Sequence, residues 1–343
     1  MRIILGSQSP RRKKVLNDAG YVIEVLPAYF DEESIRHTEP AQLTQLLAAA
    51  KNRVLQERVS GSPCIITADT VVTHAGRIYE KAQTEHEAYE WITSFMGSTI
   101  DIHTSHVVHD MHTGYEAQHT AVASVSFSEI PQDVRMQLAL NAYEASVAGG
   151  FHMCDPLLKA YVTIHGDEAT ILGLDIAWVR ATLTHIEKLH IRERLRTLYA
   201  EHDLELYAAD AAHFIATQEL FIHARRVYAY HPIPTLEIPF VAALMNAYPE
   251  KQWVFPETQG DTMHFPGAEL EESAVCMLVP ALGLSTSGER LGKGKGFYDR
   301  YLEIHPQCAA ASIAVVPDFA FFPALPVDTH DVPVRVVHSV PTL

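Results

Sequence analysis

The chain has 343 residues, which exceeds the size at which one hydrophobic core usually keeps growing, so two domains are expected. Hydrophobic residues make up 48% and charged residues 20% of the composition, as in an ordinary globular protein, and no apolar run is long enough to span a bilayer. The formal net charge of −16 argues against a nucleic-acid partner.

The start of the chain and its cysteines predict a cytoplasmic location. Basic residues at 11–14 follow a short apolar run, whereas a secretory signal places its charges before a longer one. The cysteines lie far apart and form no C-x-x-C pair, which favours free thiols in a reducing compartment. They are Cys64, Cys154, Cys276 and Cys308.

Regular elements are predicted along the whole chain. Short apolar, β-branched runs predict strands at residues 2–5, 64–67, 122–127, 275–279 and 312–316. Longer periodic stretches predict helices at residues 10–19, 41–58, 85–95, 132–143, 183–199, 208–224 and 236–248. Because strands and helices alternate, both halves are expected to be α/β layers. An alternating pattern at 171–179 gives way to a charged helix, which predicts domains of residues 1–182 and 183–343.

The first predicted strand leads into a loop that suits phosphate. The sequence Gly6-Ser-Gln-Ser-Pro-Arg-Arg precedes a helix that Ser9 can cap, with a proline suited to its first turn. The free N–H groups and partial positive charge of a helix N-terminus favour anions. Arg11 and Arg12 lie at the same end and add charge-assisted hydrogen bonds.

Acidic and basic residues then follow at separated positions. Glu32 lies in an acidic run, Lys51 in a predicted helix, and Asp69 just past an apolar run. Lys81 follows a hairpin-like segment around Gly76. Carboxylates at strand ends hold Mg²⁺ or activate water, and lysines neutralise a triphosphate, so this set predicts nucleotide chemistry.

The ordered set of motifs over residues 1–180 resembles the Maf family of nucleoside triphosphate pyrophosphatases. The motifs are Ser7-Gln-Ser-Pro-Arg-Arg, Asp31-Glu32, Ala50-Lys51, Ala68-Asp-Thr-Val-Val, Lys81, Ser126-Phe127 and Gly166-Asp167. The resemblance implies a mixed sheet with flanking helices. It also implies Mg²⁺-dependent cleavage between the α and β phosphates, giving a nucleoside monophosphate and pyrophosphate.

The resemblance also assigns roles to residues of this chain. Asp69 is expected to be the general base or a metal ligand, and Glu32 a second acid. The residues expected to grip phosphates are Ser7, Arg12, Lys51 and Lys81. Arg11 and Thr70 match the positions that mark the subgroup preferring dTTP and UTP.

One segment departs from that family. Cys154, in Ala148-Gly-Gly-Phe-His-Met-Cys-Asp, stands where the family has a glutamine that reads the base. A thiol cannot supply the donor and acceptor pair of an amide. This leaves open a second hypothesis, in which the first half is a degenerate scaffold or interaction module.

A glycine-rich stretch dominates the second half, Gly288-Glu-Arg-Leu-Gly-Lys-Gly-Lys-Gly-Phe-Tyr-Asp-Arg. Alternating glycines at 292, 294 and 296 let the backbone approach a ligand closely and adopt positive φ. Lys293 and Lys295 add positive charge to the same loop, which predicts an anion-binding concavity. The spacing fits neither a P-loop nor a dinucleotide fingerprint.

Residues 183–343 resemble 5-formyltetrahydrofolate cyclo-ligase, which implies a Rossmann-like three-layer α/β/α fold. The expected reaction converts 5-formyltetrahydrofolate and ATP into 5,10-methenyltetrahydrofolate, ADP and phosphate. Asp299 and Asp331 are expected to hold Mg²⁺. Glu237, at a predicted helix start, is expected to contact folate together with Met263 and Tyr298. The residues expected to bind ATP are Lys188, Arg192, Arg290, Gly292, Lys293, Gly294, Lys295 and Gly296.

Four histidines recur every three residues, at 103, 106, 109 and 112. In a strand, this period sends successive side chains to opposite faces. The pattern therefore favours scattered surface histidines over a metal site.

The sequence as a whole predicts a bifunctional enzyme with ATP as a co-substrate, Mg²⁺ as a cofactor, and small-molecule substrates as its partners. A cyclo-ligase with an inactive first half and a non-catalytic regulatory binding protein are the two alternatives. No membrane partner is expected. The oligomeric state is left open, with a homodimer as one option.

Overall fold

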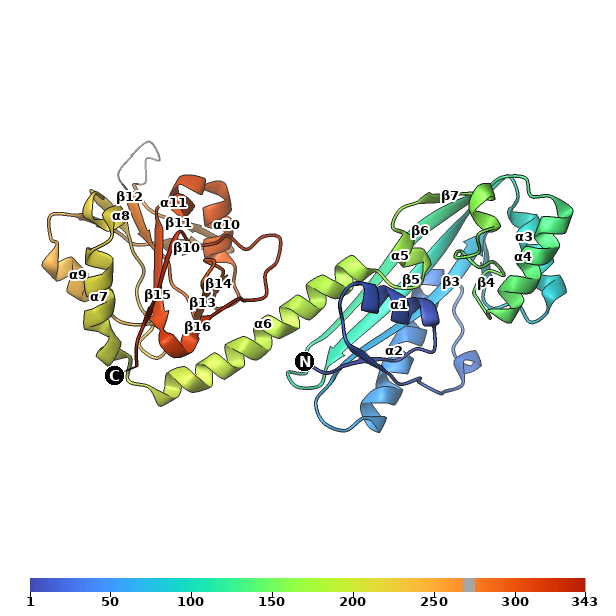
Figure 1. The fold of residues 1–343 in the computed structure, drawn as a ribbon, viewed down its shortest axis with the longest axis horizontal. Coiled ribbons are helices and arrows are strands. Elements are labelled where there is room, and N and C mark those ends of the chain that lie inside the picture. The colour runs from blue at the N-terminus through green and yellow to red at the C-terminus, as the bar shows by residue number, and fades with distance from the viewer. Residues whose placement is uncertain (268–274, 343) are drawn as a thin grey trace. The chain divides into compact units, whose positions relative to one another are not determined.

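The computed structural model describes residues 1–267 and 275–342 and divides them into two compact units. Unit 1 is Met1–Ile186 and unit 2 is Glu187–Leu343 (Figure 1). The border lies inside helix α6 (Ile176–Glu201), the same helix that holds the boundary expected after residue 182. No helix among the described residues is long and apolar enough to cross a membrane.

Unit 1 is built on a mixed seven-stranded sheet, as the Maf resemblance implies. The path runs β2-β1-β3-β5-β6-β7, with β4 paired to β3. Strand β1 pairs in parallel with β2 and β3, whereas the other pairs are antiparallel. The strands are β1 (Ile3–Leu5), β2 (Ile23–Val25), β3 (Cys64–His74), β4 (Arg77–Tyr79), β5 (Thr99–Asp110), β6 (Glu116–Phe127) and β7 (Val162–His165).

Helices flank this sheet and bury its apolar side chains. Leu43 and Leu47 of α2 pack with Val71 of β3, and Leu16 of α1 joins a second core cluster with Leu5. The unit's helices are α1 (Pro10–Asp18), α2 (Pro40–Arg58), α3 (Glu85–Phe95), α4 (Gln132–Glu144) and α5 (Glu168–Ile171), with 3₁₀ turns at Glu32–Ser34 and Leu158–Tyr161.

Strand β5 corrects the expectation for the histidine array. His106 is fully buried, and its Nε2 atom accepts a hydrogen bond of 2.8 Å from the Asp175 N–H. Burial lowers the pKa of His106 to about 4, which keeps the imidazole neutral. His106 is therefore a core residue, and the surface interpretation was wrong for it.

Unit 2 contains a five-stranded, all-parallel sheet in the order β17-β15-β12-β8-β9. Its strands are β8 (Arg226–Tyr228), β9 (Gln252–Val254), β12 (Val275–Leu278), β15 (Ser312–Pro317) and β17 (Val336–Val340). Figure 1 shows helices α7 to α9 and helices α10 and α11 on opposite sides of β12 and β15, in agreement with the predicted layers. These helices are α7 (Ala208–Ala216), α8 (Glu219–Ile222), α9 (Val241–Ala247), α10 (Phe297–Ile304) and α11 (Pro306–Ala310), and 3₁₀ turns lie at Leu204–Tyr207 and Asp318–Ala320.

Two small sheets complete unit 2. A three-stranded sheet has the order β14-β13-β16, and β10 pairs with β11 in a hairpin. The strands are β10 (Glu257–Gln259), β11 (Thr262–His264), β13 (Gly283–Ser285), β14 (Arg290–Leu291) and β16 (Phe321–Phe322).

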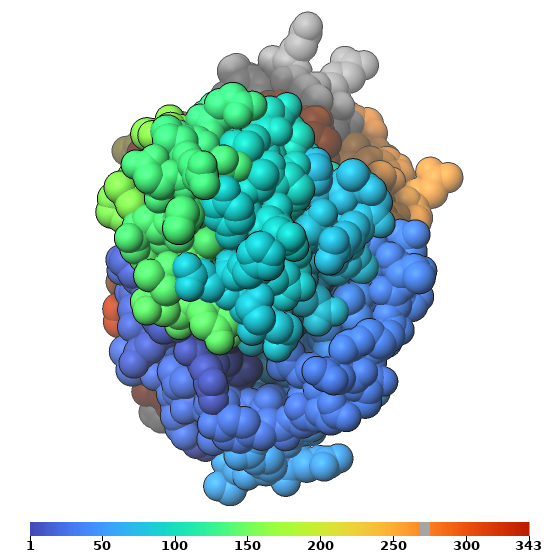
Figure 2. All heavy atoms as spheres, turned by 90° about the vertical axis from the view of Figure 1, so that its right-hand side faces the viewer, coloured from blue at the N-terminus to red at the C-terminus, as the bar shows by residue number. Residues whose placement is uncertain are grey.

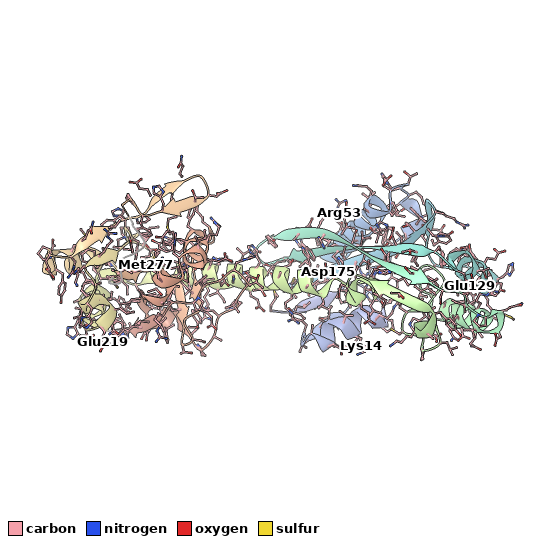
Figure 3. The ribbon with its side chains drawn as sticks, turned by 90° about the horizontal axis from the view of Figure 1, so that it is seen from above. Lys14, Arg53, Glu129, Asp175, Glu219 and Met277 are labelled. Atoms are coloured by element: carbon pink, nitrogen blue, oxygen red, sulfur yellow. The ribbon has the colours of Figure 1, made fainter. Side chains whose placement is uncertain are left out.

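Three predicted helices differ clearly from the structure. Helix α6 begins at Ile176, because Asp175 (labelled in Figure 3) accepts a 3.0 Å hydrogen bond from the Trp178 N–H in its first turn. The alternating pattern at 171–179 was therefore partly helix. The predicted helix 208–224 is two helices, α7 and α8, and 236–248 shortens to α9. Pro239 disfavours helical geometry at the residue before it, which explains the later start of α9.

Replacing Gly288 by alanine is expected to destabilise unit 2 by roughly 2–4 kcal/mol. Its φ is +93°, and an added Cβ would lie 2.4 Å from the Val334 carbonyl oxygen. Gly260 is a matched control, since its φ is +59° and a Cβ there meets nothing within 4 Å. Calorimetry of the full chain should show a clearly larger drop in Tm for Gly288→Ala. Equal drops for the two variants would contradict the steric argument.

Candidate active sites

A cavity of about 680 Å³ in unit 1 collects every phosphate-site residue expected in the first half. Figure 2 shows this face of unit 1, where the dark blue residues of the chain start lie recessed between blue and green ones. The predicted residues that line the cavity are Ser7, Arg11, Arg12, Glu32, Lys51, Asp69, Thr70 and Lys81. Residues from five separate segments thus meet in one concave site.

Lys51 of α2 lies between two carboxylates in this cavity. Its Nζ atom is 2.5 Å from Asp69 Oδ1 and 3.2 Å from Glu32 Oε1. The side chains of Lys51 and Asp69 are each 11% exposed, whereas that of Glu32 is 45% exposed. Burial raises the pKa of Asp69 above its ordinary value, although Lys51 and Arg12 act in the opposite direction.

Asp69 lies within β3 rather than at a strand end. Strand β3 was expected to stop at residue 67, but it continues to His74 and pairs with β5 through the site. The polar residues Asp69 and Thr70 interrupt the apolar pattern because the cavity, not a packed core, covers them. The Asp69 side chain is therefore positioned by the interior of a strand.

Arg12 ties three parts of the site together. Its Nε donates to the Gly173 carbonyl at 2.8 Å, Nη1 to Ser7 Oγ at 3.1 Å, and Nη2 to Thr70 Oγ1 at 3.0 Å. Burial lowers the pKa of Arg12 to about 10. The guanidinium keeps its charge at neutral pH and fixes the loop after β1 against β3.

Close packing explains the glycine that starts this loop. A Cβ on Gly6 would lie 2.4 Å from Leu55 Cδ1 and 2.6 Å from Thr67 Cγ2. The loop then turns into α1, where Ser9 caps the helix as predicted and accepts from the Arg12 N–H at 3.4 Å. The end of β1 is therefore held beside β3 and α2.

The segment that departs from the Maf pattern forms another wall of the cavity. Lys81 makes an isolated backbone bridge with Ala148, and His152 lines the cavity. Cys154 is exposed and does not itself line the cavity. From the sequence, Cys154 was singled out and His152 was missed. Only the position of His152 in the same segment could have indicated that it lines the cavity.

In unit 2, the glycine-rich loop lies against α6. Arg192 Nε donates to the Gly292 carbonyl at 2.9 Å, and a Cβ on Gly294 would lie 3.7 Å from Arg192 Cζ. Gly294 and Gly296 have φ values of +101° and +65°, as expected of a loop that needs glycine. Lys295 lies 5.9 Å from the Phe297 ring centroid.

The acidic residues of unit 2 are ion-paired with basic residues predicted to bind ATP. Asp299 Oδ1 is 2.7 Å from Arg290 Nη2, and Asp331 Oδ2 is 2.5 Å from Lys188 Nζ. Asp328, which sequence reasoning missed, lies 2.6 Å from the same Lys188 atom. Within residues 1–267 and 275–342, no three His, Cys, Asp or Glu side chains are grouped as a metal site.

Glu237 is a buried carboxylate beside the glycine-rich loop. Its Oε1 atom is 2.8 Å from Lys293 Nζ, and its Oε2 atom accepts from the Ile233 N–H at 2.8 Å. It precedes α9 by four residues, so its predicted place at a helix start was wrong. A carboxylate in this position can accept hydrogen bonds from a polar heterocycle.

The other two expected folate contacts lie at different places in unit 2. Tyr298, in the first turn of α10, has its ring centroid 5.8 Å from Arg290 Cζ, and burial raises its pKa. Met263 is in β11 and packs partly buried against the core. Tyr298 thus joins the charged cluster through Arg290, whereas Met263 contributes apolar surface.

Comparisons with known proteins match two separate parts of the chain. Residues 2–186 match the family described as Maf-like protein, and residues 262–340 match the 5-formyltetrahydrofolate cyclo-ligase family. A 7-methyl-GTP pyrophosphatase of Dictyostelium discoideum is 34% identical over 182 residues, which cover 50% of this chain and 90% of that protein. A dTTP/UTP pyrophosphatase of Lacticaseibacillus casei is 32% identical over 176 residues, covering 51% and 94%.

A solved structure resembles part of this chain. It is a 5,10-methenyltetrahydrofolate synthetase from Mycoplasma pneumoniae, 22% identical, with a TM-score of 0.38 over 44% of this chain and 97% of that one. The two family matches cover the segments in which the cavity and the glycine-rich loop lie. The chain belongs to the Maf-like protein family through residues 2–186, and it carries a segment of the 5-formyltetrahydrofolate cyclo-ligase family at residues 262–340.

Proposed function

We propose that unit 1 hydrolyses nucleoside triphosphates of the dTTP and UTP type to monophosphate and pyrophosphate. The observation that carries this proposal is the cavity in which Lys51 contacts both Asp69 and Glu32 beside further basic residues. Relatives that share this half are named pyrophosphatases, which supports the same activity. The preference for dTTP and UTP is proposed from Arg11 and Thr70, and both residues line the cavity.

The contacts assign a separate role in hydrolysis to each group of residues. Asp69, buried in β3, accepts a proton from the attacking water, and Lys51 orients its carboxylate. Ser7, Arg11 and Lys81 bind the triphosphate and neutralise charge as it develops on the leaving pyrophosphate. Arg12 keeps the loop after β1 in place through its contacts with Ser7 and Thr70.

Mg²⁺ fits the donor set of this cavity. Glu32 and Asp69 present carboxylates to the same Lys51 ammonium, and Mg²⁺ is typically held by one or two carboxylates plus substrate phosphates. When bound there, the ion supplies Lewis-acid stabilisation of phosphate charge. Glu32 and Asp69 would be the residues that hold it, beside Lys51.

Product analysis tests this activity directly. Purified full-length protein is incubated with UTP and Mg²⁺, and the products are separated by chromatography. We expect equal amounts of UMP and pyrophosphate, because attack at the α phosphate breaks the α–β bond. Release of UDP and orthophosphate, or no release at all, would refute the proposal for unit 1.

On the acidic side of the pH profile of kcat/KM, the change in rate is expected to follow the ionisation of Asp69. Because burial raises its pKa, kcat/KM should rise with pH through a pKa above the ordinary aspartate range. The folded state also binds this proton more tightly than the unfolded chain. The associated stability is therefore full at low pH and lost as pH rises through the raised pKa. Rates and denaturant midpoints across this range check both trends, and a limb at the ordinary aspartate pKa would contradict them.

We further propose that unit 2 converts 5-formyltetrahydrofolate and ATP into 5,10-methenyltetrahydrofolate, ADP and phosphate. The carrying observation is the glycine-rich loop that lies against Arg192 while Lys293 contacts the buried Glu237. Transfer of the γ-phosphoryl group to the formyl oxygen gives an imidate phosphate. N10 then displaces phosphate, and no protein nucleophile is required.

The ion pairs of unit 2 fit this chemistry. Lys188 and Arg290 are cations suited to ATP phosphates, and Asp331 and Asp299 are their present partners. Asp299 and Asp331 would be the residues that hold Mg²⁺, and the ion would supply neutralisation of phosphate charge there. Asp328 is a second carboxylate partner of Lys188, at 2.6 Å.

The absorbance of the methenyl product tests the second activity. Full-length protein is mixed with 5-formyltetrahydrofolate and Mg²⁺, with and without ATP. Absorbance is expected to grow only with ATP, and one ADP should form for each methenyl group. ATP-independent growth, or none, would refute the proposal for unit 2.

A second candidate keeps only the cyclo-ligase activity and makes unit 1 a scaffold. Cys154 favours this reading, because it supplies no amide and is exposed outside the cavity lining. The UTP assay separates the two readings. A cytoplasmic location, a homodimer and the absence of a nucleic-acid partner stay predictions.

A further inference from the structure

An exposed aromatic ring on the cavity wall of unit 1 is left unused by the chemistry above. Tyr29 lines the cavity and is 67% exposed. Among the described tyrosine, phenylalanine and tryptophan rings, the other exposed one is Tyr143, which is 44% exposed and does not line the cavity. An apolar ring held open to water at a ligand cavity marks a surface that a ligand can cover.

Two contacts fix this ring in place. Gln8 Nε2 donates to the Tyr29 hydroxyl oxygen at 2.9 Å, and Gln8 itself lies between the two serines of the phosphate loop. Arg58 Cζ is 5.9 Å from the ring centroid, and Arg58 Nη1 donates to the Pro27 carbonyl at 3.0 Å. The ring is thus oriented before any ligand arrives.

Arg58 is not among the residues that line the cavity, whereas Tyr29 and Gln8 are. The guanidinium therefore lies by the ring without lining the cavity, and the ring keeps most of its surface exposed. Because Gln8 connects the ring to Ser7 and Ser9, the ring stands at a fixed place relative to the phosphate loop. A ligand with phosphates and a flat apolar part matches this combination.

We propose that Tyr29 is the stacking residue for the nucleobase of the nucleoside triphosphate. The proposal rests on the proposed function of unit 1 and adds a binding role outside the charged residues. Every base has a π face, so Tyr29 favours nucleotides over inorganic polyphosphates without choosing among bases. Discrimination among bases is left to the polar residues of the cavity.

Kinetics of Tyr29 variants test this role in the full-length protein. Tyr29→Ala should raise KM for UTP roughly tenfold and leave kcat within about twofold, since stacking is lost but the catalytic groups remain. Tyr29→Phe keeps the ring but loses the Gln8 contact, so its KM should lie much closer to the wild-type value than that of Tyr29→Ala. Tyr143→Ala removes the other exposed ring and serves as the matched control. An unchanged KM in Tyr29→Ala, or Tyr29→Phe as impaired as Tyr29→Ala, overturns the proposal.

A fluorescence titration decides the point independently of turnover. Tyr29→Trp is combined with Asp69→Asn, which prevents hydrolysis, and Asp69→Asn alone corrects for the native tryptophans. UTP should change the emission of the added tryptophan, whereas inorganic tripolyphosphate, which lacks a base, should not. An equal response to both ligands, or none to UTP, overturns stacking. If the wild type releases no pyrophosphate, the proposed function fails and this titration alone decides the role of Tyr29.

Discussion

Replacing Asp69 by asparagine is expected to lower kcat for UTP hydrolysis by roughly 10³-fold or more. Asparagine has nearly the same shape but cannot accept a proton from water. It also removes the negative charge that faces Lys51 at 2.5 Å and the charge expected to help hold Mg²⁺. Release of pyrophosphate measures the loss, and methenyl formation by the same sample shows that unit 2 is intact.

The neighbouring acidic residues supply a matched pair of controls. Glu32→Gln removes a carboxylate 3.2 Å from Lys51 and should lower the rate strongly, whereas Glu33→Gln changes the exposed residue next to it and should not. Equal effects of the two glutamine variants would mean that the negative charge of this turn supports hydrolysis, and not the specific contact between Glu32 and Lys51. Full activity in Asp69→Asn would remove Asp69 from the mechanism.

In unit 2, Asp299→Asn is expected to lower methenyl formation by roughly 10²-fold or more. The asparagine oxygen can still accept from Arg290 Nη2, which now donates to Asp299 at 2.7 Å, so the fold should persist. What is lost is the carboxylate charge proposed to act with Mg²⁺ on the ATP phosphates. ATP-dependent absorbance of the product measures the effect.

Asp261→Asn is the control for this variant, because Asp261 is exposed and offers only its backbone carbonyl to Arg300. It should retain wild-type rates. UTP hydrolysis by Asp299→Asn should also be unchanged. A loss of both activities would point to unfolding, and a fully active Asp299→Asn would contradict the assignment of Asp299.

Most residues of the candidate site of unit 1 could be predicted from the sequence, because they fall in short motifs separated by recognisable elements. Ser9 before Pro10 predicted the start of α1, and the capping contact is present. The contacts between these motifs could not be predicted. Nothing in the sequence relates Arg12 to Gly173, which lie 161 residues apart, because that pairing is set by the sheet topology.

Short buried strands were the main gap in the fold prediction. Strand β8 has only three residues, Arg226–Tyr228, all buried, so neither alternation nor length distinguishes it from a loop. Its pairing between β12 and β9 depends on parallel connections that local patterns do not encode. Asp328 was missed for a similar reason, since its partner Lys188 is 140 residues away.

Helix α6 has a practical consequence for dividing this protein. Its first half supplies Val179, Leu183 and Ile186 to the core of unit 1, and its second half supplies Leu195 and Tyr199 to the core of unit 2. Between these stretches it bears Lys188 and Arg192. If the gene were cut after codon 182, the unit 1 fragment would lose the core side chains of Leu183 and Ile186. The unit 2 fragment would begin inside the helix, so its first turn would fray just before Lys188 and Arg192. Separate expression therefore calls for overlapping fragments that each retain the complete helix.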